Sequence, residues 1–306
     1  MTLRRNSAVA IALLCAALAT AGCGLGPGER LGGVELTVTR DYGSEPMLRR
    51  QVDDVTESDT VMRVLEREAE ISTRYGGGFV QEIDGVEAQE RFSHSLDWFY
   101  FVNGVEASVG AADYRLRGGD RIWWDYRDWS AAIGVPAVVG SWPEPFLHGY
   151  DGHRHPALVE CRGGGIACEI VGESLRRAGV AVDQGARDDA IRVLVGPWGR
   201  VRRDATAAQI ERGQRASGVF ADFQRRAGGG YALWGLGVDG RYVRAFGPRA
   251  GLVAATRRGE GPPVWVVTGA AVAGAEAAAR LLDSTHLRDR YAIVAEAGKE
   301  EPVPLR

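Results

Sequence analysis

The segment from Arg121 to Trp129 alternates like a strand, and one of its two faces carries two indoles beside a pair of opposite charges. Its core-like face holds Ile122, Trp124 and Tyr126. Its other face holds Trp123, Asp125, Arg127 and Trp129. Aromatic surface with a few polar groups suits a flat ligand, a sugar or a protein partner, and a soluble monomer seldom leaves it open to solvent. The same face could instead pack on a second domain, so ligand binding and domain docking both stay open.

Imidazole is a common metal ligand, and one polar segment carries His148, Asp151, His153 and His155. Their spacing matches no helical or zinc-knuckle arrangement, and a polar loop is where solvated histidines ordinarily occur. The sequence therefore predicts no metal site there.

Catalytic motifs are absent from the sequence. It has no Gly-x-Ser-x-Gly elbow, no His-Glu-x-x-His helix and no Walker loop. Glu173, Asp204 and Asp283 fall in helical contexts where solvated charge is the default. The glycines from Gly269 to Gly274 depart from the dinucleotide pattern Gly-x-Gly-x-x-Gly. We expect no enzyme and no catalytic residue, although folding could still bring two carboxylates together.

The amino terminus has the plan of a secretory signal: Arg4 and Arg5, an apolar run from Ala8 to Ala21, then small residues before Cys23. The run is too short to span a membrane as a helix. Thr20-Ala-Gly-Cys23 resembles the lipobox of bacterial lipoproteins, with Thr20 where Leu is commonest. This predicts a signal peptide over residues 1–22, lipidation of Cys23, a tether over residues 23–33 and a location on the extracytoplasmic face of the cell membrane. An ordinary signal peptide with an incidental cysteine is the alternative.

Two cysteines remain for the folded part of an exported chain, because Cys15 leaves with the signal and Cys23 is lipidated. Cys161 and Cys168 enclose a short glycine-rich loop. Their spacing fits neither a zinc knuckle nor a redox-active Cys-x-x-Cys pair. In an oxidising compartment we expect them to form a structural disulfide.

Composition sets the broad class. The chain has 306 residues, 45% of them hydrophobic and 25% charged, which is typical of a globular protein of about two domains. A formal net charge of -3 offers no bulk attraction to nucleic acid, so no nucleic-acid partner is predicted.

The elements that must position the aromatic strand follow a recognisable order from residue 34 to residue 129. Residues 34–38 alternate as a strand, a second strand follows near residues 47–52, and apolar spacing after Ser58 or Asp59 predicts a capped helix. Strands then follow at residues 79–83, 98–102 and 121–129, with Asn103-Gly104 as a hairpin signal. Two strands, a helix and further strands are the order of a β-grasp sheet.

The residues of this domain resemble a known family. The matching motifs are Val61-Met-x-x-Leu65, Gly78-Phe-Val-x-x-Ile83-x-Gly85, Asp97-Trp-Phe-Tyr-Phe-Val-Asn-Gly104 and Tyr114-x-Leu-x-x-Gly-Asp-x-Ile-x-Trp124. They are similar to the β-grasp domain related to the carboxy-terminal domain of transcobalamin and intrinsic factor, known in bacteria mostly as a domain of unknown function on exported proteins. The resemblance covers about a third of the chain and implies binding of a soluble ligand, with a corrinoid as one candidate. The helical partner domain of those transporters has no counterpart here.

Together, the aromatic strand and the resemblance give the candidate ligand-binding residues Trp98, Tyr100, Trp123, Asp125, Arg127 and Trp129. No other cofactor is predicted.

The rest of the chain is less informative. Residues 130–156 are rich in proline and glycine and read as an extended connection. From residue 157 to residue 306, strands alternate with helices, which predicts an α/β domain with a mixed sheet. The expected fold class is therefore α+β: a β-grasp-like amino-terminal domain followed by an α/β domain.

These observations predict a membrane-anchored extracytoplasmic lipoprotein that binds a small molecule for uptake, with a membrane transporter as a possible partner. The alternative is a non-catalytic cell-envelope adaptor that binds a protein or a polymer.

Overall fold

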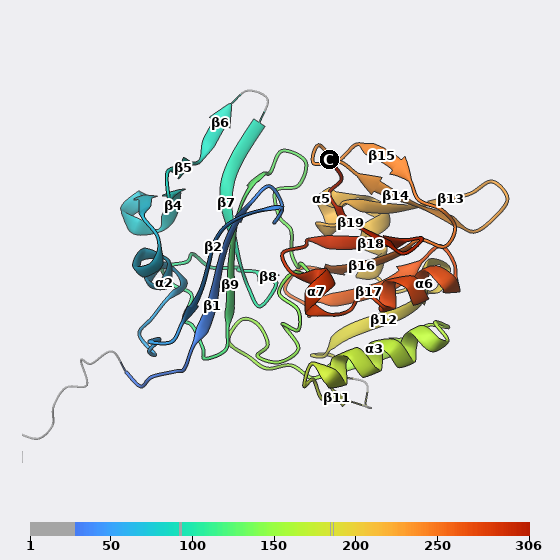
Figure 1. Ribbon diagram of the computed structural model, residues 1–306, viewed down its shortest axis with the longest axis horizontal. Coiled ribbons are helices and arrows are strands. Elements are labelled where there is room, and N and C mark those ends of the chain that lie inside the picture. The colour runs from blue at the N-terminus through green and yellow to red at the C-terminus, as the bar shows by residue number, and fades with distance from the viewer. Residues whose placement is uncertain (1–27, 92–93, 184, 186) are drawn as a thin grey trace, which may run out of the picture.

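The structure, a computed structural model, describes residues 28–91, 94–183, 185 and 187–306. The predicted signal peptide and Cys23 lie outside these residues. The fold is α+β, with one mixed sheet in the amino-terminal half and a larger mixed sheet with helices in the carboxy-terminal half, as the sequence predicts (Figure 1).

The first sheet is built as the apolar alternation predicts. Its strands are β1 (Val34–Arg40), β2 (Glu45–Val52), β6 (Gln89–Arg91), β7 (His94–Val102), β8 (Val105–Glu106) and β9 (Arg121–Asp128). The order is β2-β1-β9-β7-β6, with β8 paired to the end of β7, and β1 runs parallel to β9 at the centre. Asn103 and Gly104 turn β7 into β8 with positive φ at both residues, as the two-residue hairpin requires.

One face of this sheet is covered by α2 (Val61–Glu68) and a small sheet of β3 (Ile71–Arg74), β4 (Phe79–Ile83) and β5 (Val86–Glu87), which encloses the core (Figure 1). The helix cap is Thr60, one residue after Asp59 and two after Ser58, because the Thr60 side chain accepts the backbone N–H of Arg63. The 3-10 turn η1 (Tyr75–Gly77) joins β3 to β4.

The second sheet has the order β11-β10-β12-β17-β16-β18-β19. Its strands are β10 (Ala157–Cys161), β11 (Val182–Asp183), β12 (Ile191–Pro197), β16 (Gly251–Thr256), β17 (Val264–Gly269), β18 (Ala292–Glu296) and β19 (Lys299–Val303). The helices α3 (Ile166–Arg177), α6 (Val272–Ala279) and α7 (Ser284–Leu287) pack on one face. The opposite face bears α4 (Trp198–Val201), η2 (Ala207–Arg212), α5 (Gln214–Ser217) and a sheet of β13 (Ala221–Arg225), β14 (Tyr231–Leu236) and β15 (Tyr242–Ala245).

The segment between the two sheets is more compact than an extended connection. It folds into turns that bury Trp142, Phe146 and Tyr150 in the core beneath α3 and α6. The domain limits at residues 129 and 157 stay a prediction.

The predicted disulfide is confirmed. Cys161 at the end of β10 is bonded to Cys168 in the first turn of α3, with their Cα atoms 5.9 Å apart.

Candidate functional site

The face of β9 that carries Trp123, Asp125 and Arg127 packs against the second half of the chain. Trp123 is only 2% exposed, and the other two side chains have no exposed surface. Trp123 shares a core with Phe101 and Tyr291, whose rings lie 5.6 and 5.5 Å from its own. The interpretation of these three residues as an open ligand platform is therefore wrong: the alternative, domain docking, is what covers them.

Asp125 is fully hydrogen-bonded within this contact. It accepts from Thr39 Oγ1 at 2.6 Å, from the Gly43 N–H at 3.1 Å and from Tyr291 Oη at 2.9 Å. Burial raises the pKa of Asp125 to about 6, even though these three bonds favour the carboxylate. The carboxyl group has no free face for a ligand, so its role is to join the two halves.

Arg127 is the neighbouring buried charge. Its Nη1 and Nη2 atoms donate to the carbonyls of Ala132 and Ile133, both at 2.8 Å, and its guanidinium lies 3.8 Å from the ring centroid of Phe99. These contacts hold in place Ala132 and Ile133, which follow β9 in the sequence.

An open pocket lies instead beside residues 97–100 of β7, and we call it the edge pocket. Its volume is about 400 Å³. Its aromatic walls are Phe79, Trp98, Phe99, Tyr100, Trp124 and Trp129. The remaining lining residues are Gly78, Val80, Asp97, Glu106, Ala107, Val109, Gly110, Ala111 and Ile133. The structure thus brings Trp98, Tyr100 and Trp129 of the predicted set together and separates them from the other three.

The strand pairing explains why the pocket exists. On the outer edge of β7, β6 pairs only as far as Leu96, and β8 pairs only with Phe101 and Val102. The outward N–H of Trp98 is bonded to Asp97 Oδ1 at 2.8 Å, which leaves it unavailable to an added strand. On this edge, β7 therefore has a gap between its partner strands β6 and β8. Side chains from both faces of the sheet border this gap.

Hydrogen bonds and ring contacts hold the aromatic walls. Tyr100 stacks on Trp124 with centroids 4.9 Å apart, and its hydroxyl donates to the Val109 carbonyl. Trp98 Nε1 donates to the Val86 carbonyl at 3.1 Å. The buried indole N–H of Trp124 has no acceptor among the described residues. The aromatic walls are therefore held in place by contacts within the chain itself.

The mouth of the pocket is apolar. Phe79, Val109 and Ile133 surround it and are 42%, 48% and 70% exposed, respectively. Exposed apolar groups that border an aromatic cavity mark a binding surface more often than scattered ones do.

Two carboxylates complete the lining. Glu106 Oε2 accepts the Val135 N–H at 3.0 Å, and burial raises the pKa of Glu106. Asp97 reaches the pocket from β7. No arginine, lysine or histidine is among the described lining residues.

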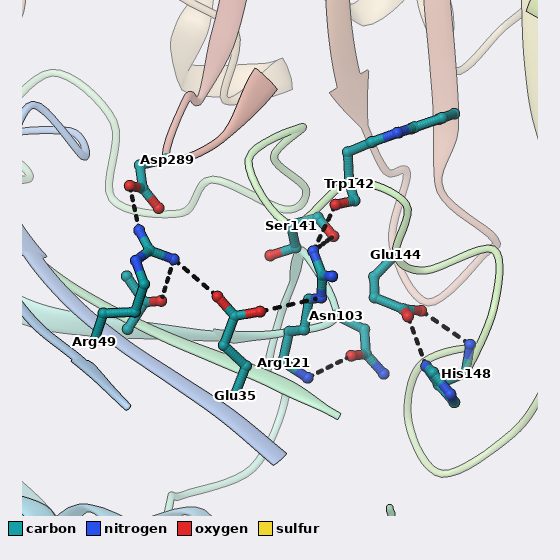
Figure 2. Close-up of polar contacts among 10 residues, drawn as sticks. Glu35, Arg49, Asn103, Arg121, Ser141, Trp142, Glu144, His148 and Asp289 are labelled. Atoms are coloured by element: carbon teal, nitrogen blue, oxygen red, sulfur yellow. Dashed lines mark hydrogen bonds and ion pairs between the residues drawn. The ribbon is translucent and has the colours of Figure 1, made fainter. Parts of the chain in front are cut away.

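A second cavity, of about 60 Å³, lies where the first sheet meets the second half. Figure 2 shows its polar contacts. Arg49 donates to Glu35 at 2.8 Å and to Asp289 at 2.6 Å, while Arg121 lies 3.5 Å from Glu35. These four charges neutralise one another in a space too small for more than water-sized molecules, so we assign the cavity to the contact between the halves.

The histidine-rich segment has other partners. His148 Nδ1 lies 2.6 Å from Glu144 Oε1, a contact that Figure 2 also shows. The ring of His155 stacks on Tyr150, and Asp151 pairs with Arg257 at 3.1 Å. Among residues 28–91, 94–183, 185 and 187–306, no group of three His, Cys, Asp or Glu side chains is placed to hold a metal ion.

Sequence reasoning missed the lining residues Phe79, Phe99, Glu106, Val109 and Ile133. Its assignment of Trp124 to the core is correct, because Trp124 is 3% exposed and packs in the core of the first sheet while one side of it borders the pocket. Phe79 and Phe99 stand within the family-like motifs, which is the one signal that could have indicated them.

None of the described helices is long and apolar enough to cross a membrane.

Comparisons with known proteins found similarity over part of the chain. A crystal structure from Ruminococcus gnavus ATCC 29149, described as "a putative metal binding protein", is similar over 32% of this chain and 97% of its own, with 16% identity and a TM-score of 0.25. No curated protein matches the chain. Residues 58–128, which hold most of the lining of the edge pocket, match the family described as a domain of unknown function (DUF4430).

Proposed function

We propose that this protein is an exported, lipid-anchored binding protein that captures a small molecule in the edge pocket and presents it for uptake. The observation that carries the proposal is the pocket itself: about 400 Å³, pre-formed aromatic walls and an exposed apolar mouth. Small-molecule sites typically combine such a volume and lining with a few polar groups.

The secretory plan of the amino terminus and the Cys23 lipobox support the location. An acylated Cys23 would hold the folded part near the membrane surface through the tether at residues 23–33. A transporter in that membrane would be the recipient of the ligand.

A corrinoid remains one candidate, because the transcobalamin-like motif contributes Trp98, Tyr100 and Trp124 to the walls. A whole corrinoid is much larger than the pocket. It could insert only a peripheral group while its ring stayed outside, so a compact ligand fits better.

Calorimetric titration tests the proposal. The wild type is titrated with the small-molecule fraction of its native envelope, and separately with cobalamin and cobinamide. We expect saturable binding that Phe79→Ala weakens about fivefold or more, because the change removes an aromatic ring from the mouth of the pocket. Tyr75→Ala is the matched control, because Tyr75 is 88% exposed and does not line the pocket. Binding that is equal in Phe79→Ala and wild type would overturn the assignment.

A further inference from the structure

We propose that the edge pocket selects a compact, flat and uncharged aromatic molecule, and that it binds charged analogues of the same shape less tightly. This inference rests on the proposed function and adds the chemical class of the ligand to it.

The two acids of the lining are neutralised within the chain. Glu106 Oε1 lies 3.8 Å from Arg127 Nη2, and Glu106 Oε2 accepts the Val135 N–H at 3.0 Å. Asp97 lies opposite Arg127 where β7 pairs with β9. Its Oδ1 atom accepts the Trp98 N–H at 2.8 Å, and its side chain makes a further interaction within the chain. Neither carboxylate is therefore a free counter-charge for a ligand.

Arg127 is the cation nearest to this lining, and it is not open to a ligand. Its side chain is 0% exposed, and its Nη atoms donate to the carbonyls of Ala132 and Ile133. Its guanidinium lies 3.8 Å from the ring centroid of Phe99, so its charge opposes a second cation at that ring. Among the described lining residues, a ligand charge of either sign would leave water without a free partner, which is unfavourable.

Three of the aromatic walls present carbon atoms to the pocket. The indole N–H of Trp98 donates to the Val86 carbonyl at 3.1 Å, and the Tyr100 hydroxyl donates to the Val109 carbonyl. The indole nitrogen of Trp124 is itself buried. The polar atoms of these walls are thus occupied or covered, which favours a ligand whose contact surface is apolar.

The shape of the ligand follows from the rings that surround it. The lining contains six aromatic side chains, and Tyr100 is stacked on Trp124 with 4.9 Å between centroids. Aromatic rings pair best in offset-stacked or edge-to-face arrangements, which a flat ring system can adopt and a saturated one cannot. The exposed side chains of Phe79, Val109 and Ile133 at the mouth extend the apolar contact.

The test uses probes that share one carbon frame. The compound 2-naphthalenemethanol is flat and neutral, 2-naphthoate is its anionic analogue, and 2-naphthylmethylammonium is its cationic analogue. Decahydro-2-naphthalenemethanol is neutral but saturated, so it is not flat. Each probe is titrated by calorimetry near neutral pH into the full folded protein.

We expect 2-naphthalenemethanol to bind about tenfold or more tightly than either ion, because the pocket gives a ligand charge no free partner. It should bind about threefold or more tightly than the saturated alcohol, which lacks aromatic contacts. Phe79→Ala should weaken binding of 2-naphthalenemethanol, because it removes an aromatic ring from the mouth.

A charge added at the mouth tests the cause of the selectivity. Ile133 is 70% exposed, so Ile133→Lys places a cation beside the pocket without replacing a buried side chain. The variant should raise the affinity for 2-naphthoate relative to 2-naphthalenemethanol by about threefold. Tyr75→Lys is the matched control, because Tyr75 is 88% exposed and does not line the pocket, and it should leave this ratio unchanged. A uniform loss of folded protein does not alter a ratio.

The outcomes separate this inference from the proposed function. If an ion or the saturated alcohol binds as tightly as 2-naphthalenemethanol and Phe79→Ala weakens both, the pocket binds ligands but the inferred class is overturned. An unchanged ratio in Ile133→Lys would also overturn it. If no probe binds at millimolar concentration, the inferred class fails, and titration with the envelope fraction still decides the proposed function.

Discussion

Tyr291 donates a 2.9 Å hydrogen bond to Asp125 Oδ2, and both side chains are buried where the first sheet meets the second half. The two residues are separated by most of the folded chain, so the bond forms only when both halves are folded and in contact. This buried contact explains why the face of β9 that carries Trp123 and Asp125 is not exposed to solvent as a ligand-binding surface.

Asp125 should make the stability of the protein depend on pH in an unusual direction. Its pKa is raised from 3.8 to about 6 in the folded state, so the folded protein holds this proton more tightly than the unfolded chain. The stabilisation is complete below about pH 4 and is lost as the pH rises through 6. Across this range it amounts to on the order of 2–3 kcal/mol.

The measurement is the free energy of unfolding in urea at pH 4.5 and pH 7, in the wild type and in Asp125→Asn. The wild type should gain stability relative to the variant as the pH falls. Parallel pH profiles would show that Asp125 does not titrate in this way.

Trp123→Ala should destabilise the fold by about 3–5 kcal/mol, the usual loss for a buried aromatic side chain. Trp129→Ala, on the same face of the strand but half-buried at the edge pocket, is the matched control and should cost less. Urea denaturation of both variants gives the comparison. A loss below about 1 kcal/mol for Trp123→Ala would contradict the buried contact with Phe101 and Tyr291.

The Cys161–Cys168 disulfide should contribute about 2–3 kcal/mol through the short loop it closes. The double variant Cys161→Ser/Cys168→Ser should therefore unfold at lower urea concentration than the oxidised wild type. Intact-mass analysis after alkylation should find no free thiol at these positions unless a reductant is added, and two labelled thiols without reductant would refute the bond in the exported protein.

Replacing Cys23 by Ser should release the protein from the membrane fraction, because the predicted acyl chains have no other attachment point. Immunoblotting of membrane and soluble fractions measures the change. Retention of Cys23→Ser in the membrane would reject the lipid anchor.

The elements of the first sheet could be predicted because their signals are local. Alternation marks β1 and β9, and Asn103-Gly104 marks the hairpin after β7. The strand β16 has no alternating pattern, because Gly251–Thr256 is buried on both faces in the second sheet. Ala207–Arg212 form the 3-10 helix η2, and composition does not determine whether such a segment adopts the 3-10 or the α-helical hydrogen-bond register.

The candidate site was predicted only in part for a similar reason. Alternation correctly placed Trp123 and Asp125 on one face, but what covers that face depends on Tyr291, far away in the sequence. The edge pocket depends on how early β6 and β8 stop pairing with β7, and no local pattern encodes that limit. Glu106 lies at the pocket because β8 pairs with the end of β7, where Glu106 is opposite Phe101.

Native mass spectrometry of protein purified from its own envelope tests whether the edge pocket captures a small molecule. We expect one small molecule bound per chain in the wild type and in Tyr75→Ala, and none in the double variant Phe79→Ala/Trp129→Ala. A wild type that carries no small molecule after exposure to the envelope extract, or a double variant that carries it equally well, would contradict the claim.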